Sequence, residues 1–156
     1  MSLGQQFFKP LPKLKIRKDG KEAVTSWNKT TINIDFRTNN GAVICGSKNN
    51  IIVLDIDLKK PESKLADGFD EFNKYLSAFK PIETLTVKTP SGGMHYYFNY
   101  NHSDERTTYL IKNYLKNRSG YRNASIDIRT EGCYILIPGS SINGKEYEII
   151  NDTELI

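Results

Sequence analysis

The sequence predicts an α+β domain built mainly around an antiparallel sheet. Short strand-like runs outnumber helix-like runs along the 156 residues, glycine-containing turns join neighbouring runs, and one segment has the spacing of an amphipathic helix. A hydrophobic content of 38% and a charged content of 26% are typical of a globular protein. The length suits a single domain over residues 1–156, with helices packed on the sheet. No apolar run has membrane-spanning length and the N-terminus has no signal-peptide core, so we expect a cytoplasmic protein without a membrane partner.

The first half of the chain predicts an edge strand and a hairpin. Residues 9–22 (KPLPKLKIRKDGKE) carry six basic side chains against two acidic ones. The alternation in LKIRK indicates an edge strand with one cationic face, which would bind a polyanion or simply keep an exposed edge from aggregating. Residues 42–45 and 51–58 then predict two strands of a hairpin joined through GSKNN.

A helix and further strands are expected in the second half. In residues 63–81 apolar side chains recur at helical spacing until Pro81 ends the pattern, namely Leu65, Phe69, Phe72, Leu76 and Phe79. Residues 84–88 and 94–100 predict a second hairpin across TPSGG. Residues 106–122 are basic without a single acid and predict a loop or short helix. Further strands are expected at residues 125–129, 133–137 and 146–150, with turns at TEG and SSING.

Two aspartates lie inside the strand predicted for residues 51–58. Residues two apart in a strand share a face, so Ile52, Leu54, Ile56 and Leu58 are expected to face the core. Asp55 and Asp57 would lie on the opposite face, about 6–7 Å apart. Carboxylates so placed raise each other's pKa, whereas a divalent cation would reverse that cost, and oxygen ligands favour Mg²⁺ or Mn²⁺.

A third acid follows the same pattern. In SIDIRTEG, Asp127 and Arg129 share a face opposite to two isoleucines. If this strand lies beside the first, Asp127 joins Asp55 and Asp57, and three carboxylates can hold two metal ions about 3.5–4 Å apart for in-line phosphoryl transfer. A D-x-D pattern alone is weak, and solvated aspartates at a strand end remain the alternative.

A tight glycine turn precedes a histidine in TPSGGMHYYF, residues 89–98. The backbone of Ser91, Gly92 and Gly93 can approach a ligand closely, and exposed N–H groups in such turns bind phosphate. Alternation in the next strand places His95 beside these donors, where it could donate to a phosphate oxygen. A plain hairpin with a surface histidine is the alternative.

The cysteines and the net charge bear on two further properties, zinc binding and the charge of a partner. Cys45 and Cys133 lie in apolar, strand-like contexts, and neither has a second Cys or a His at zinc-ligand spacing. We therefore expect small hydrophobic side chains and no zinc site. A net charge of +4 and a pI near 9.0 permit a polyanionic partner without requiring one.

Three motifs occur in a familiar order. They are D-I-D at 55–57, T-P-S-G-G-x-H-x-x-F at 89–98, and I-D-I-R-T-x-G-x-Y-I-L-x-P-x-S at 126–140 with G-x-x-Y after it. With N-N-G-A-V-I-C-G at 39–46, they resemble the bifunctional primase–polymerase (prim-pol) domain of the archaeo-eukaryotic primase superfamily, common in viruses, phages and plasmids. The resemblance covers about residues 27–147.

The resemblance implies an enzyme, a template-dependent nucleotidyltransferase (DNA primase and DNA polymerase) on an RRM-like catalytic fold. Asp55, Asp57 and Asp127 would be the catalytic ligands of two Mg²⁺ or Mn²⁺ ions. His95, with Ser91, Gly92 and Gly93, would hold the incoming nucleoside triphosphate, and Arg129 would contact a phosphate.

The resemblance also implies partners and a setting. The partners would be a single-stranded DNA template and primer, gripped by residues 9–22 and 106–122 and stacked on Tyr109, Tyr114 or Tyr121. Prim-pol domains often precede a helicase, so we expect a helicase domain or subunit, with this chain as the N-terminal part of a larger polypeptide. The setting would be replication in a bacterial cell or infected host.

The sequence departs from the pattern in two places, and two other function classes remain open. Many members carry Ser where this chain has Gly93, and several carry a zinc-binding insertion that two isolated cysteines cannot supply. A non-catalytic nucleic-acid module would carry aromatic side chains where this sheet carries carboxylates. A metal-dependent nuclease or replication initiator of the rolling-circle kind would need two clustered histidines, and only His95 has a suitable position.

Overall fold

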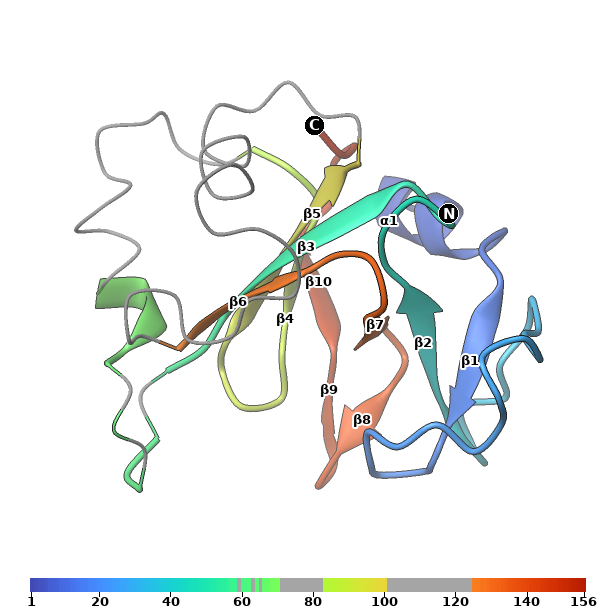
Figure 1. The fold of residues 1–156 in the computed structure, drawn as a ribbon, viewed down its shortest axis with the longest axis horizontal. Helices are drawn as coiled ribbons and strands as arrows, with labels where there is room; N and C mark the ends of the chain where they lie inside the picture. Colours follow the sequence, from blue (N-terminus) through green and yellow to red (C-terminus); the bar gives the residue numbers. More distant parts are fainter. Residues whose placement is uncertain (59, 63, 65, 71–82, 101–124) are drawn as a thin grey trace.

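The computed structural model describes residues 1–58, 60–62, 64, 66–70, 83–100 and 125–156. Its strands form a three-stranded sheet of order β1-β2-β7, a five-stranded sheet of order β10-β4-β5-β3-β6 and a small hairpin, β8-β9 (Figure 1). All strand pairs in these sheets are antiparallel, in agreement with the predicted α+β class. No helix in the described part of the chain is long and apolar enough to cross a bilayer.

The elements follow one another along the chain as expected for successive short strands. Their bounds are α1 Leu3–Phe8, β1 Lys13–Ile16, β2 Asn40–Ile44, β3 Ile51–Ile56, β4 Thr86–Lys88, β5 Met94–Asn99, β6 Ile126–Arg129, β7 Tyr134–Leu136, β8 Ser141–Ile142, β9 Lys145–Glu146 and β10 Glu148–Asn151. The strands predicted at 84–88, 94–100, 125–129, 133–137 and 146–150 all have counterparts among them. The SSING turn lies in the β8-β9 hairpin, with Asn143 and Gly144 both at positive φ.

β3 lies between β5 and β6 in the five-stranded sheet and is buried along its whole length. Ile52, Leu54 and Ile56 pack on one face, in a cluster with Phe98, Ile126 and Ile128, as predicted. Ile51 and Val53 pack on the other face against the core formed with β1 and β2. Leu58 was expected in the core but is 46% exposed, because the strand ends at Ile56.

The hairpin predicted for residues 42–45 and 51–58 is wrong. β2 pairs with β1 and β7, whereas β3 pairs with β5 and β6 in the other sheet. The two strands meet only at a bridge between Gly46 and Ile51. Gly46 and Asn50 have positive φ, so this turn passes the chain from one sheet to the other (Figure 1). Both edges of each strand are already paired, β2 with β1 and β7 and β3 with β5 and β6, so neither strand has an edge left for the other.

The predicted edge strand is β1, at the edge of the three-stranded sheet. Its cationic face is only partly as expected: Lys15 is exposed, but Lys13 is 5% exposed. Burial lowers the pKa of Lys13, and its Nζ donates to the carbonyl oxygens of Lys9 at 3.1 Å, Leu11 at 2.9 Å and Ile32 at 2.7 Å. Lys13 therefore ties loops together instead of facing a partner.

Helical structure is limited among the described residues. Helix α1, which the sequence analysis did not predict, begins at a capping box of Ser2 and Gln5. The helix predicted for 63–81 begins at residue 68, where Asp67 Oδ1 accepts from the backbone N–H groups of Phe69 and Asp70. Its remainder, and the basic segment 106–122 with its three tyrosines, lie outside the described residues.

Candidate active site

A row of polar side chains crosses the five-stranded sheet at one level. His95 of β5 and Asp127 of β6 both lie directly opposite Asp55 of β3. Directly opposite residues in an antiparallel pair point to the same face, so the ladder places all three on one side of the sheet. The sequence predicted that Asp55 and Asp127 share a face if their strands are neighbours. The register shows that His95 lies on the same face, on the strand at the other edge of β3.

Asp57 lies just beyond the end of β3, and its backbone is fixed on both sides. Its N–H donates to the Ser125 carbonyl oxygen at 2.8 Å, and its own carbonyl oxygen accepts from the N–H of Gly68 at 2.9 Å. Its carboxylate fills the space beside Gly93, where a Cβ would lie 2.5 Å from Asp57 Oδ1 and 2.6 Å from the Ile56 carbonyl oxygen. The glycine that replaces the expected serine therefore makes room for Asp57.

The two acids of β3 have pKa values shifted in opposite directions. Burial opposes ionisation of Asp55, yet His95 and Arg129 hold its pKa below the ordinary value. His95 Nε2 lies 3.4 Å from Asp55 Oδ1, and Arg129 Nε lies 4.0 Å from Oδ2. Burial, followed by the charge of Asp55, raises the pKa of Asp57. The surroundings therefore favour the charge of Asp55 and oppose the charge of Asp57.

Asp55 also has a buried oxygen without a hydrogen-bond donor. Oδ1 has no such partner in the described part of the chain, and its contact with His95 Nε2 at 3.4 Å is an ion-pair contact without hydrogen-bond geometry. A buried carboxylate oxygen left in this state costs free energy that a bound cation would recover. The oxygen-only donor set of Asp55 and Asp57 suits a hard divalent ion, so these residues fit Mg²⁺ or Mn²⁺.

Asp127 does not converge on the other two carboxylates. Its Oδ2 lies 2.8 Å from Arg129 Nη2, two residues further along the same face of β6. Although burial opposes it, the charges of Asp127 and Asp55 raise the pKa of Arg129. Across the described ranges, no group of three or more His, Cys, Asp or Glu side chains is arranged to hold a metal ion. Among the side chains, Asp127 pairs with Arg129, while Asp55 and Asp57 lie near each other.

The amides of the glycine turn are engaged within the turn. The N–H of Gly92 donates to the Thr89 carbonyl oxygen at 3.0 Å, and the N–H of Gly93 donates to Thr89 Oγ1 at 3.0 Å. Gly92, at φ +93°, needs to be glycine for the turn to close. Two of the amides expected to bind phosphate, those of Gly92 and Gly93, thus already have acceptors. Ser91 lies at the cavity, with its hydroxyl 3.3 Å from Thr89 Oγ1.

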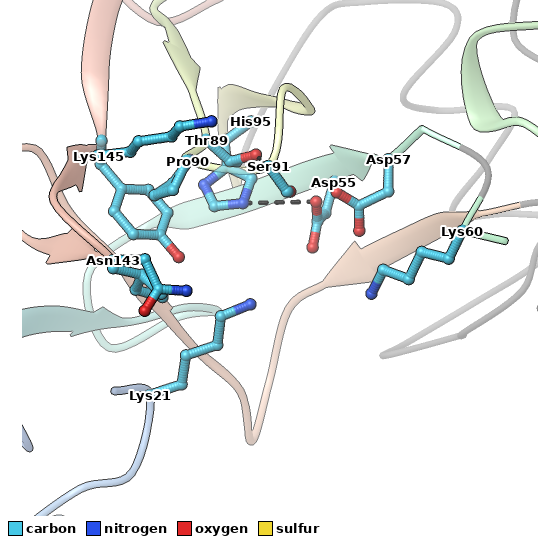
Figure 2. Close-up of a pocket in the computed structure, with 12 residues that line it drawn as sticks. Lys21, Asp55, Asp57, Lys60, Thr89, Pro90, Ser91, His95, Asn143 and Lys145 are labelled. Atoms are coloured by element: carbon cyan, nitrogen blue, oxygen red, sulfur yellow. Dashed lines mark hydrogen bonds and ion pairs between the residues drawn. The ribbon is translucent and has the colours of Figure 1, made fainter. Parts of the chain in front are cut away.

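A cavity of about 260 Å³ opens over Asp55 and Asp57 and is lined by cations on its other sides. Lys21, Lys60 and Lys145 contribute to its wall, together with Ser91 and His95 and with Asn143 and Tyr147. Figure 2 shows Lys21 and Lys60 extending from different sides toward the space in front of the acids. Burial, followed by the charges of Asp55 and Asp57, raises the pKa of Tyr147, so its hydroxyl stays protonated.

These three lysines were not among the predicted site residues. Lys21 lies at the end of the basic segment 9–22, Lys60 follows the D-I-D motif closely, and Lys145 lies inside G-x-x-Y. Each had a weak local signal, but only the fold shows that three separate segments meet at one cavity.

A second cavity of about 350 Å³ lies on the Arg129 side of the row. It shares Lys21, Asp55, His95 and Tyr147 with the first, and its own wall includes Trp27, Arg129, Cys133 and Tyr134. Cys45 is buried, as predicted, and Cys133 is partly buried at this wall.

Comparison with known proteins gives one family. The model of the bifunctional DNA primase/polymerase N-terminal domain (Prim-Pol) matches residues 10–156, which include both cavities and the whole polar row. No curated protein sequence matches the chain.

Proposed function

The chain belongs to the family of bifunctional DNA primase/polymerase N-terminal domains, and from this premise we propose that it is a template-dependent nucleotidyltransferase of RRM-like catalytic fold. It would use two divalent metal ions to join nucleoside triphosphates on single-stranded DNA. The observation that carries the proposal is the row of His95, Asp55 and Asp127, with Asp57 just beyond the end of β3, beside a lysine-lined cavity.

Asp55 and Asp57 would hold the metal ions. Asp55 Oδ1 has no hydrogen-bond partner among the described residues and the pKa of Asp57 is raised, so both carboxylates would gain from a bound cation. Asp127 would join as the third ligand by sharing its carboxylate between Arg129 and a metal ion. Bound there, Mg²⁺ or Mn²⁺ would activate the attacking hydroxyl and neutralise the leaving pyrophosphate.

The lysine-lined cavity would receive the triphosphate. Its three ammonium groups supply the positive charge that a triphosphate requires, and they come from two loops and the β8-β9 hairpin. Ser91 would add a hydroxyl, and the Nε2 of His95, now 3.4 Å from Asp55, lies where a phosphate oxygen could compete for its proton. The chain would therefore orient the triphosphate with side chains, since the amides of Gly92 and Gly93 already donate to Thr89.

The strand-binding side and the biological setting follow from the family and from charge. Arg129 would contact a phosphate, and the basic segments 9–22 and 106–122 would hold template and primer through their backbones. We propose replication of viral, phage or plasmid DNA as the setting, in the cytoplasm of a bacterial cell or infected host, with a helicase domain or subunit as partner.

Primer synthesis on an unprimed single strand tests the proposal directly. Wild-type protein with Mg²⁺ or Mn²⁺ and triphosphates should make labelled products, and Asp55→Asn or Asp57→Asn should reduce synthesis by at least about 100-fold, because each removes a metal ligand. Asp35→Asn is the matched control, since Asp35 forms an exposed ion pair with Arg37 outside both cavities. Full synthesis by the Asp55 variant would refute the assignment. Cleavage of the strand without extension would favour the nuclease or replication initiator. In a separate titration, absence of metal-dependent triphosphate binding by the wild-type protein would favour the non-catalytic module.

A further inference from the structure

The second cavity differs in chemistry from the first. Beyond the shared wall it offers two aromatic rings, Trp27 and Tyr134, and one cation of its own, Arg129. The ring centroids of Trp27 and Tyr134 lie 5.4 Å apart at an interplanar angle of 72°. An exposed aromatic side chain is ordinary by itself, but here a ring that is 38% exposed lines the same cavity as Asp55.

Both rings are held by their surroundings. Tyr134 Oη donates to the Lys21 carbonyl oxygen at 2.7 Å, which ties β7 to the loop that carries a lysine of the first cavity. Trp27 lies in a turn closed by a hydrogen bond from the N–H of Lys29 to the Ser26 carbonyl oxygen at 2.9 Å. A stacking surface fixed in this way loses little conformational entropy when a planar ligand binds.

The charge of the second cavity suits one nucleotide of a strand better than a triphosphate. Among the described residues, Arg129 is the one cation that this cavity does not share with the first. It is already paired with Asp127 at 2.8 Å and lies 4.0 Å from Asp55, so it adds little unpaired positive charge to that of Lys21. The three lysines of the first cavity are better suited to a triphosphate. A strand brings one phosphate with each base, and every base has a flat face that stacks on an aromatic ring.

We propose that Trp27 and Tyr134 form a stacking site for a base of single-stranded DNA at the entrance to the reaction centre. This inference rests on the proposed function, because it assigns the strand to the Arg129 side of the polar row and the triphosphate to the lysine side.

Trp27 is the one tryptophan of the chain, so its fluorescence reports on this site without interference. We expect a metal-free titration with a short oligothymidylate to quench it to saturation. An abasic oligonucleotide of the same length and inorganic triphosphate should leave it unquenched, since neither contains a base. Equal quenching by the abasic strand would overturn the stacking site, and quenching by a nucleoside triphosphate but not by the oligonucleotide would overturn the choice of the strand.

Variants test the same site without the fluorescence signal. Trp27→Leu should weaken binding of a labelled oligonucleotide, measured by anisotropy, by about 5- to 100-fold, while Trp27→Phe should keep most of the affinity. Val24→Ala is the matched control, because Val24 is exposed in the same loop and does not line the cavity. Unchanged affinity of Trp27→Leu would refute the inference.

The two proposals fail separately. If primer synthesis is absent but oligonucleotides still quench Trp27, the enzyme assignment is lost and the stacking site stands. If synthesis is normal and no base quenches Trp27, only the stacking site is lost.

Discussion

Replacing Gly93 with alanine should damage the site through a single added methyl group. The Cβ would lie 2.5 Å from Asp57 Oδ1, 2.6 Å from the Ile56 carbonyl oxygen and 3.1 Å from Thr89 Oγ1. The first two distances are shorter than a carbon–oxygen contact allows, and the second involves the backbone of β3, which cannot retreat without disturbing its pairing with β5. Such overpacking costs about 1–3 kcal/mol, equivalent to a fall in Tm of about 3–10 °C for a domain of this size.

The loss of activity should exceed the loss of stability. A displacement of Asp57 by about 1 Å moves a proposed metal ligand, and misplacement of that size can cost about 100-fold in rate. Gly93→Ser should be no better than Gly93→Ala, although it restores the serine expected from the family pattern, because the Cβ meets the same atoms. Primer synthesis well below the Tm and Mn²⁺ titration would measure both effects.

Gly92→Ala is the matched control for the glycine turn. Gly92 has φ +93°, so alanine there should cost about 1–2 kcal/mol in backbone strain, but its Cβ would meet only Leu58 Cδ1 at 3.1 Å. Both variants should therefore lose stability, and only Gly93→Ala should lose metal affinity. Wild-type synthesis by Gly93→Ala, or equal losses in the two variants, would refute the argument that the glycine makes room for Asp57.

Three further predictions concern charge. Lys21→Gln and Lys145→Gln should each raise the KM for the triphosphate by about 3- to 10-fold in steady-state extension, with a smaller change in kcat; an unchanged KM would remove these lysines from the triphosphate site. Lys13→Met should lower the free energy of unfolding by about 2–3 kcal/mol in urea, because three carbonyl oxygens lose their donor; an unchanged midpoint would show that water replaces it. The pKa of Asp57 is raised on folding, so its charge opposes folding once the pH exceeds that pKa; Asp57→Asn should therefore raise the Tm of the metal-free protein at pH 7, and the difference should vanish at about pH 3, where wild-type Asp57 is also neutral. A lower Tm at pH 7 would contradict this sign.

The sequence predicted strands better than it predicted their partners. Alternation fixed the two faces of β3 and β6, and a short glycine turn made the β4-β5 hairpin a sound prediction. The pairing of β2 with β3 failed because a continuous apolar run indicates burial on both faces without saying which strand lies on either side. The register that places His95 opposite Asp55 was beyond reach for the same reason.

The site shows a similar division between local and long-range information. The Asp127–Arg129 pair was within reach, since residues two apart on a strand share a face. The hydrogen bond from a turn amide to the Thr89 side chain could also have been predicted, because a threonine ahead of such a turn commonly accepts from it. The meeting of Lys21, Lys60 and Lys145 was not, because it depends on three segments far apart in sequence.

The acids and the cations of the site are held in different ways. Asp55 is fixed by strand ladders on both sides, within the sheet that also forms the core. Lys21 and Lys145 are carried by a loop and by the β8-β9 hairpin, which meet where the Asp19 carboxylate accepts from the N–H of Asn143. Asp19 and Asn143 both have positive φ, which Asp and Asn adopt readily in tight turns, so the contact joins two tight turns at the surface. Opening of this contact would withdraw cations from the proposed triphosphate site without disturbing the carboxylates, because local opening at the surface costs less than opening of the core. Binding of triphosphate should therefore be more sensitive than binding of metal to substitutions at Asp19, and equal sensitivity of the two would show that the whole site is held as one unit.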